Sequence, residues 1–311
     1  MRTSQAEQVA AATAAAQTRR RTLRDYLEEE YVLGYLFLLP AALLILTFVA
    51  YPFAFGIWLS LTDARIGVPP NFIGLGNFRE LLSDSIFHQT VRNAFTYTGV
   101  ATVFKFLLGM AMALLLNREF RFKRFARAAV LLPWIVPTVL SAVAWLWMYD
   151  STFSVFNWML AKVGIQGPIW LGDGRWPLFS LIVVNIWRGA PFYGINFLAG
   201  MQTIPKELYE AAQIDGASRV RQFWHITLPM LQPVILVVLL LSIILTFADF
   251  QLVWVLTRGG PANSTHLFAT LAYQVGLASA QIGAGAAISL FMFPVLSIIV
   301  FVIIWVLRRE Q

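Results

Sequence analysis

The sequence predicts an all-α membrane protein with six transmembrane helices. Of its 311 residues, 59% are hydrophobic and 13% are charged, whereas soluble domains are about half apolar and about a quarter charged. The apolar residues form blocks long enough to cross a bilayer as helices, which needs about 20 residues each, and helices satisfy their own backbone hydrogen bonds there. The absence of cysteine excludes disulfides, thiolate nucleophiles and Cys metal sites.

The N-terminal segment, residues 1–32, is polar and Ala-rich and contains the charged run RRRTLRDYLEEE. It has no apolar stretch followed by a small-residue cleavage site, so we expect no removable signal peptide there. The expected structure is a cytoplasmic tail, with a docking helix as the alternative. Residues 33–311 are then expected to form one membrane domain.

Six apolar blocks follow in order, at about residues 33–61, 94–116, 128–149, 178–200, 230–256 and 282–307. The first is interrupted by Pro40 and Pro52, and its length of nearly thirty residues implies tilt or a protruding end. The third contains Pro133 and Pro137. The loop at 150–177 is rich in Gly and Trp, which suits an ordered cap outside the membrane.

The distribution of Lys and Arg predicts the orientation of these spans. With six spans, both termini lie on one side, and cytoplasmic loops carry the excess of Lys and Arg. The N-terminal tail, the turn after the second span, the loop after the fourth span and the C-terminus contain 5, 5, 3 and 2 of them, against 3, 2 and 1 in the opposite loops. Both termini are therefore predicted in the cytoplasm, and the net charge of +7 indicates membrane topology rather than nucleic-acid binding.

The loop at 202–229 is a polar segment between two strongly apolar blocks, and it contains ELYEAAQIDGASRVRQFWHITLP. Pro205 suits the first turn of a helix, Gly216 suits the left-handed residue that ends it, and Ser218 suits the N-cap of a second helix. The predicted structure is a rigid helix-turn-helix that could dock into a cleft on a soluble partner. Its small and charged candidate contacts are Glu207, Glu210, Ala211, Ala212, Asp215 and Gly216.

The residues give little support to a catalytic function. His88, His225 and His266 are expected at the surface, in loops or at a membrane edge, and none has a partner at a metal-ligand spacing. No Gly-rich loop ends in Gly-Lys-Ser/Thr, so this chain is not expected to bind ATP by that route. We expect no catalytic residue, metal or cofactor in the chain. Energy must come from a partner subunit or from an ion gradient, and an ion-coupled secondary transporter is the alternative function.

Polar side chains within the spans are costly in a membrane and therefore indicate candidate functional sites. Helical spacing places Asn185, Arg188, Gly189 and Phe192 on one face of the fourth span, and Ser242, Thr246 and Asp249 on one face of the fifth. Together these faces suit a water-filled sugar site. Alternatively, Arg188 and Asp249 link helices structurally, and the hydroxyls bond their own backbone. Lys105, in the second span, is expected to snorkel or to pair structurally.

The segments Glu210-Ala211-Ala212, Gly216 and Ile226-Thr227-Leu228-Pro229 resemble the signature loop of membrane subunits in binding-protein-dependent ABC importers. FIGLGNF at 72–78 resembles a loop of the same family, and WRGAPF and LTRGGPANST resemble its carbohydrate-uptake branch, which includes the larger maltose-importer subunit and sugar or glycerol-phosphate permeases. The resemblance implies a type I permease fold. It also implies a set of substrate-lining positions: Asn185, Arg188, Gly189, Phe192, Ser242, Leu245, Thr246 and Asp249. Arg188 replaces an apolar residue of the maltose subunit and Asp249 an amide, so an anionic or differently shaped solute is possible.

The resemblance further implies partners and a mechanism. The partners are two ATP-binding subunits that hold ATP and Mg, a second homologous permease, and an extracytoplasmic solute-binding protein, free or lipid-anchored. The complex would lie in a bacterial or archaeal cytoplasmic (inner) membrane, surrounded by lipid, and would import a carbohydrate or related solute. Transport would follow alternating access, with the loop at 202–229 transmitting ATP-driven closure of the partner subunits.

Overall fold

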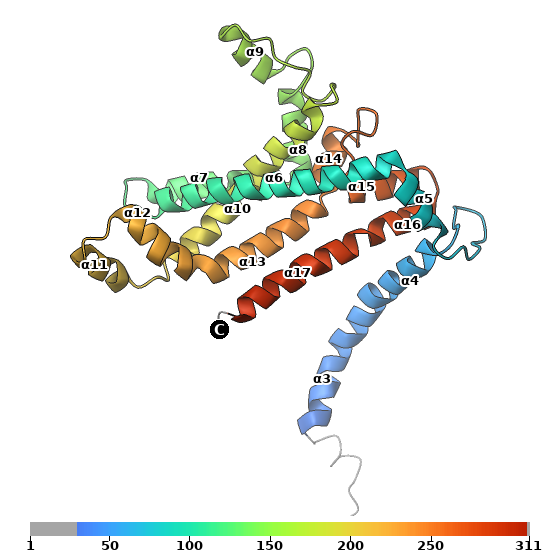
Figure 1. Cartoon of the computed structure of the whole chain (residues 1–311), viewed down its shortest axis with the longest axis horizontal. Coiled ribbons are helices and arrows are strands. Elements are labelled where there is room, and N and C mark those ends of the chain that lie inside the picture. Colours follow the sequence, from blue (N-terminus) through green and yellow to red (C-terminus); the bar gives the residue numbers. More distant parts are fainter. Residues whose placement is uncertain (1–29, 310–311) are drawn as a thin grey trace, which may run out of the picture. The chain divides into compact units, whose positions relative to one another are not determined.

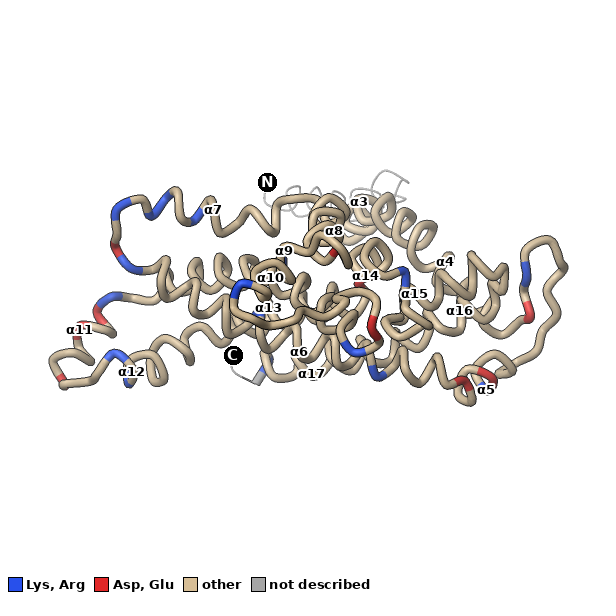
Figure 2. Tube along the Cα trace, turned by 90° about the horizontal axis from the view of Figure 1, so that it is seen from above, with Lys and Arg blue, Asp and Glu red and all other residues tan. Residues whose placement is uncertain are grey.

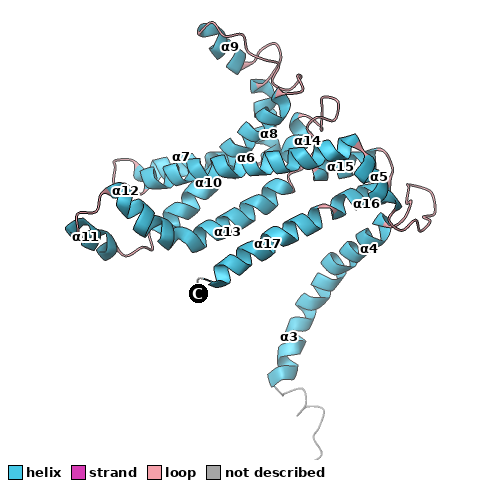
Figure 3. Ribbon diagram, in the orientation of Figure 1, coloured by secondary structure: helices cyan, strands magenta, loops and turns pink. Residues whose placement is uncertain are grey.

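The computed structural model describes residues 30–309, and within that range the chain is almost entirely helical, with two isolated β-bridges and no sheet (Figure 3). The chain divides into two compact units, one up to Gly56 and one from Ile57 onward. The expected tail at 1–32 lies almost wholly outside the described residues.

The first unit consists of α3 (Glu30–Ile45), a π-helical segment (Leu46–Ala50) and the beginning of α4 (Tyr51–Ser60). Together these elements make a continuous apolar helix, Tyr31–Ser60, that is long enough to cross a membrane, which confirms the first predicted span. Large apolar side chains such as Phe37 and Phe48 are exposed along it. This pattern is typical of a helix that meets lipid or another subunit.

Three long helices form the centre of the second unit: α6 (Ser85–Leu116), α10 (Trp176–Met201) and α13 (Leu228–Phe247). They contact one another and lie side by side (Figure 1). The backbones of α6 and α10 approach closely, because a Cβ on Gly109 would overlap the Cβ of Tyr193. The side chains of Tyr97, Tyr193 and Phe197 are fully buried here, and small residues at such crossings are typical of packed membrane helices.

The second span begins earlier than predicted. We expected it from about residue 94, but α6 begins at Ser85, where the Asp84 carboxylate accepts a hydrogen bond from the Ile86 N–H at 2.8 Å. This N-cap satisfies a backbone donor that the first turn leaves unpaired. The preceding α5 (Gly76–Ser83) carries Asn77, whose buried amide donates to the Ser60 and Thr62 carbonyls, both at 2.8 Å. Asn77 therefore anchors the loop that follows α4.

The third predicted span, 128–149, is not a single straight helix. It is divided into α7 (Lys123–Ile135) and α8 (Thr138–Met148), which meet at an angle of 89°. Val136 and Pro137 between them have extended backbone, with ψ of 132° and 136°. A proline disfavours the helical conformation of the residue before it and cannot donate within the helix, so the break falls at Pro137.

The fifth predicted span, 230–256, is also interrupted. The helix α13 ends at Phe247 and α14 (Gln251–Leu256) begins after a three-residue break at Ala248, Asp249 and Phe250. The prediction that Asp249 continues the helical face of Ser242 and Thr246 is therefore wrong, since Asp249 lies in the break.

The remaining helices are α9 (Val155–Lys162), α11 (Lys206–Ile214), α12 (Arg219–Gln222), α15 (Phe268–Tyr273), α16 (Ile282–Leu290) and α17 (Met292–Arg309), with π-helical segments at Phe223–Thr227 and Gln274–Ala278. In the described residues, five helices are long and apolar enough to cross a membrane, or six if the bent pair α7–α8 counts as one span. The chain thus has the predicted membrane fold.

The loop between α14 and α15 is ordered by side-chain hydrogen bonds. The Asn93 amide on α6 donates to the Ser264 carbonyl at 2.8 Å and to the His266 carbonyl at 3.2 Å. His266 is only 1% exposed, so its expected surface position is wrong. The ring lies where a Cβ on Gly259 would be, and Gly259 has φ of +85°, so a close approach of backbone and ring shapes this loop.

Candidate functional site

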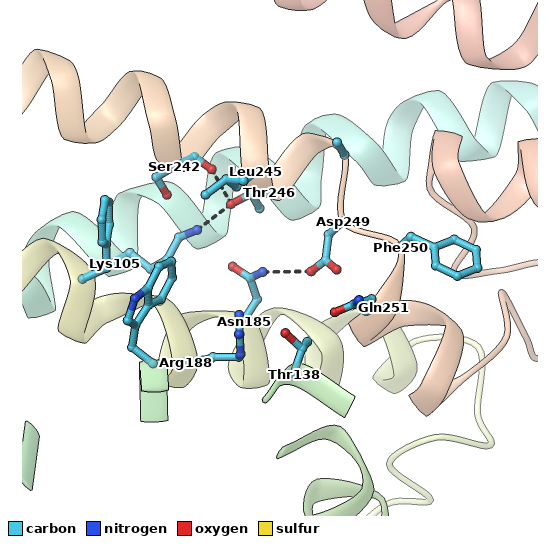
Figure 4. A pocket seen from close by; sticks show the side chains of 14 residues that line it. Lys105, Thr138, Asn185, Arg188, Ser242, Leu245, Thr246, Asp249, Phe250 and Gln251 are labelled. Carbon is cyan, nitrogen blue, oxygen red and sulfur yellow. Dashed lines mark hydrogen bonds between the residues drawn. The ribbon is translucent and has the colours of Figure 1, made fainter. Parts of the chain in front are cut away.

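A cavity of about 450 Å³ lies between the central helices of the second unit (Figure 4). Its size is that of a small-molecule site. All eight residues proposed from the sequence line it: Asn185, Arg188, Gly189 and Phe192 from α10, Ser242, Leu245 and Thr246 from α13, and Asp249 from the break after α13. The fold therefore brings the two predicted groups together around one space.

The Asp249 carboxylate is the centre of a hydrogen-bond network at one wall of the cavity. Its Oδ2 accepts from the Tyr97 hydroxyl at 2.7 Å and from the Asn185 amide at 3.2 Å, and its Oδ1 accepts from the Leu252 N–H at 3.3 Å. The break after Phe247 makes this possible, because it frees Asp249 from the helix and turns it toward α6 and α10.

Lys105 crosses from α6 into the same cavity. Its side chain is 2% exposed, and its ammonium donates to Thr246 Oγ1 at 2.7 Å, while that hydroxyl donates to the Ser242 carbonyl at 2.6 Å. The lysine stem passes over Gly189, since a Cβ on Gly189 would overlap the Lys105 Cδ. Gly189 therefore gives Lys105 the room to reach Thr246.

An aromatic pair lines the cavity beside Arg188. Trp134 from α7 and Phe192 from α10 are stacked, with ring centroids 4.8 Å apart and an interplanar angle of 26°. The Arg188 guanidinium lies 5.5 Å from the Trp134 ring centroid, a cation–π distance that holds the charge in place. Stacked rings beside polar groups suit the apolar faces and hydroxyls of a sugar.

Arg188 and Asp249 do not pair directly. In the part of the chain that the structure describes, the ion pair with N···O within 4 Å joins Lys123 and Glu119, remote from the cavity. The Arg188 Nε and the Asn185 Oδ1 are buried and have no hydrogen-bond partner within residues 30–309. Buried polar atoms are nearly always paired in proteins, so these two atoms are candidate contacts for a bound solute.

The cavity has six further lining residues that the sequence did not identify as such: Lys105, Trp134, Thr138, Ala248, Phe250 and Gln251. Of the two expectations for Lys105, snorkelling to the membrane edge is wrong and structural pairing agrees with the structure, since the buried ammonium donates to Thr246. Trp134 and Thr138 enter the cavity because of the bend at Pro137. No three His, Asp or Glu side chains of the described residues are placed to hold a metal ion.

The second candidate site is the turn between α11 and α12, and the predicted helix-turn-helix is present. Gly216 has φ of +76°, its N–H donates to the Gln213 carbonyl at 3.0 Å, and the Ala217 N–H donates to the Ala212 carbonyl at 2.8 Å. These two bonds form a Schellman C-cap, which requires a left-handed residue. Ser218 caps α12 by accepting from the Arg221 N–H at 3.4 Å.

The outer surface of this turn is open. Glu207, Glu210, Ala211, Asp215 and Gly216 are exposed, and Ala212 is half-buried. Exposed apolar side chains accompany them, among which Ile214 is 88% exposed. On the inner face of α11, the Tyr209 hydroxyl forms a hydrogen bond with Thr227 Oγ1 at 2.9 Å. This bond links α11 to the N-terminal end of α13. In Figures 1 and 2 the turn lies at the end of the unit where α6 ends and α7 begins, among clustered positive charges.

The sequence of residues 105–310 matches the profile of the binding-protein-dependent transport system inner membrane component family. The chain belongs to this family. It is 37% identical over 268 residues to the trehalose/maltose transport system permease protein MalF of Thermococcus litoralis, covering 85% of this chain and 90% of that protein. It is 32% identical over 282 residues to the sulfoquinovosyl glycerol transport system permease protein SmoG of Agrobacterium fabrum, covering 90% and 92%.

A solved family member has the same fold. A chain of a bacterial ABC transporter that imports the acidic polysaccharide alginate superposes with a TM-score of 0.79 at 27% identity, covering 92% of this chain and 98% of that one. The chain described here is thus a multi-pass permease subunit of an ABC importer, as its signature loop predicts. In this chain, the cavity lies among helices long enough to span a membrane, and the α11–α12 turn lies at one end of α10 and α13.

Proposed function

We propose that this permease subunit imports a carbohydrate or a closely related solute. The observation that carries the proposal is the cavity in the second unit, where stacked Trp134 and Phe192 adjoin the polar side chains of Asn185 and Arg188. Sugars present both an apolar ring face and a rim of hydroxyls, so aromatic and polar groups in one cavity match them. The transport of trehalose or maltose and of sulfoquinovosyl glycerol by named relatives supports the same class.

The mechanism that we propose is alternating access driven by ATP hydrolysis in two partner subunits. The α11–α12 turn joins the C-terminal end of α10 to the N-terminal end of α13 through short connections. These two helices supply seven of the residues around the cavity. A movement of the turn, caused by closure of the ATP-binding subunits, would therefore shift both walls of the cavity at once.

The proposed complex contains a second homologous permease, two ATP-binding subunits that hold ATP and Mg, and an extracytoplasmic solute-binding protein. A solved alginate transporter was crystallised with such a periplasmic protein bound to an alginate pentasaccharide. In this arrangement the chain lies in the cytoplasmic membrane with the α11–α12 turn inside. The exposed Glu210 and Asp215 would contact the ATP-binding subunit, and Gly216 would hold the turn that presents them.

Coupling is tested in the reconstituted complex by ATP hydrolysis with and without solute-loaded binding protein. Glu210→Lys should reduce the stimulated rate by at least about tenfold, since a reversed charge at a docking contact changes the free energy by more than 1.4 kcal/mol. Gln202→Lys, which adds a charge at an exposed residue just before the turn, is the matched control. Equal stimulated rates in both variants and the wild type would contradict the coupling role.

The orientation is tested by single cysteines, which are easily read because the chain contains none. Ser218→Cys at the turn should be protected from an impermeant thiol reagent in intact cells. Gln166→Cys, at an exposed position in the loop before α10, should react. Reaction of Ser218→Cys from outside the cell would reverse the proposed topology.

A further inference from the structure

The cavity contains more positive than negative charge. Lys105, Arg188 and Asp249 are its charged lining residues. A charge within a membrane is costly unless another charge or a set of hydrogen bonds compensates it. The excess of one positive charge in the described lining therefore needs an explanation.

Asp249 lies near Arg188 but does not form a direct ion pair with it. Its two oxygens accept from the Tyr97 hydroxyl, the Asn185 amide and the Leu252 N–H, and no ion pair within 4 Å joins it to Arg188 in the described part of the chain. The carboxylate is thus held by neutral donors on the wall, and its capacity to accept further bonds is largely occupied.

Both cations line the cavity and keep donors that have no acceptor in the described residues. Lys105 is 2% exposed, and Thr246 is the hydrogen-bond acceptor that the described residues give its ammonium, so two of its three protons are available. Arg188 Nε is buried without a partner in the described range, and the guanidinium is fixed over Trp134 at 5.5 Å. In Figure 4 the Asn185 side chain lies between the Lys105 ammonium and Arg188.

We propose that the solute of this site is an anionic saccharide, whose carboxylate or sulfonate is bound by Arg188 and Lys105. A planar guanidinium bonds an oxyanion through two parallel N–H groups, and the buried ammonium adds a point charge. The sugar ring would pack against the aromatic pair of Trp134 and Phe192, while the Asn185 Oδ1 accepts from a hydroxyl. This inference rests on the proposed carbohydrate function and narrows it to the acidic members of that class.

The test compares matched neutral and acidic probes on the purified complex of permeases and ATP-binding subunits, without the binding protein. One pair is β-1,4-mannotriose and β-1,4-trimannuronate, which differ by a carboxylate at each C6. The other is glucosyl glycerol and sulfoquinovosyl glycerol, which differ by a sulfonate. Binding by calorimetry should favour the acidic member of at least one pair by about tenfold or more, the usual effect of a hydrogen bond to a charged group. The pair that shows the preference identifies the acidic group.

Variants then locate the selectivity. Arg188→Gln should weaken binding of the acidic probe about tenfold more than binding of the neutral probe, and so abolish the preference, and Arg188→Lys should retain part of it. Arg175→Gln removes the same charge at an exposed position outside the cavity and should change nothing. Equal or weaker binding of both acidic probes by the wild type overturns the inference but leaves carbohydrate import intact. Binding of none of the four probes overturns both.

Discussion

Gly189→Ala is expected to disturb the cavity through Lys105 rather than through α10. The added methyl group would overlap Lys105 Cδ, so the lysine must leave the rotamer in which its ammonium bonds Thr246 at 2.7 Å. A hydrogen bond to a charged group contributes about 1.5–3 kcal/mol, and alanine recovers about 1 kcal/mol of helix propensity over glycine. The net loss is therefore about 0.5–2 kcal/mol, localised at the cavity.

A double-mutant cycle with Lys105→Met separates this effect from general helix packing, because residues in contact show a coupling energy. The fraction of intact complex that survives heating, and solute binding to it, are measured for both single variants and the double variant. Gly189→Ala should be destabilising alone but neutral or stabilising by up to about 1 kcal/mol in the Lys105→Met background, where the flexible thioether can move aside. Gly99→Ala, on α6 with nothing within 4 Å of its added Cβ, is the control for propensity.

The reasoning would be refuted by an equal cost of Gly189→Ala in both backgrounds. Such a result would mean that the alanine disturbs the α6–α10 packing itself and that the lysine stem is not what occupies the space over Gly189.

Two further predictions concern the loops that border the unit. Asn77→Ala should lower the free energy of unfolding by about 2 kcal/mol, because two carbonyls lose a buried donor; the exposed Asn71→Ala should cost less in the same heating assay. Burial lowers the pKa of His266 to about 4, below the ordinary value of about 6.5. The ring is neutral in the fold, so stability falls as the pH drops from about 6.5 toward 4, by about 2 kcal/mol at pH 5. His266→Gln should remove this pH dependence, and an unchanged dependence would contradict the assignment.

The parts of the fold that the sequence predicts well are those set by local chemistry. Apolar blocks mark the spans, and the α11–α12 turn follows from Gly216 and Ser218, whose backbone roles depend on immediate neighbours. The N-terminal extension of α6 was missed because its first turns, SIFHQTVRN, are not apolar. Their helicity comes from the Asp84 cap and from packing against other helices, and neither is visible in hydropathy.

The two breaks near the cavity differ in how far sequence can reveal them. Pro137 indicates an interruption, but the 89° angle between α7 and α8 depends on what each half packs against. No proline or glycine marks Ala248 to Phe250. That break is stabilised by a hydrogen bond that the Asp249 carboxylate accepts from the Tyr97 hydroxyl. Tyr97 lies on α6, 152 residues earlier in the sequence. Helical spacing therefore placed Asp249 in the right cavity for a wrong local reason.

This origin of the break bears on how the cavity works. If the carboxylate of Asp249 holds the chain out of the helix, then its neutral donors, Tyr97 and Asn185, are already committed to the fold. Recognition of a solute must then fall to groups that the fold leaves unpaired, which are Arg188 Nε, Asn185 Oδ1 and the remaining protons of Lys105. Asp249 maintains the shape of the cavity, while Arg188 and Lys105 give the cavity its net positive charge. Because Asn185 bonds Asp249 through its nitrogen and its oxygen has no partner in the described residues, it connects the two tasks, and a solute hydroxyl bound to that oxygen would act directly on the break between α13 and α14.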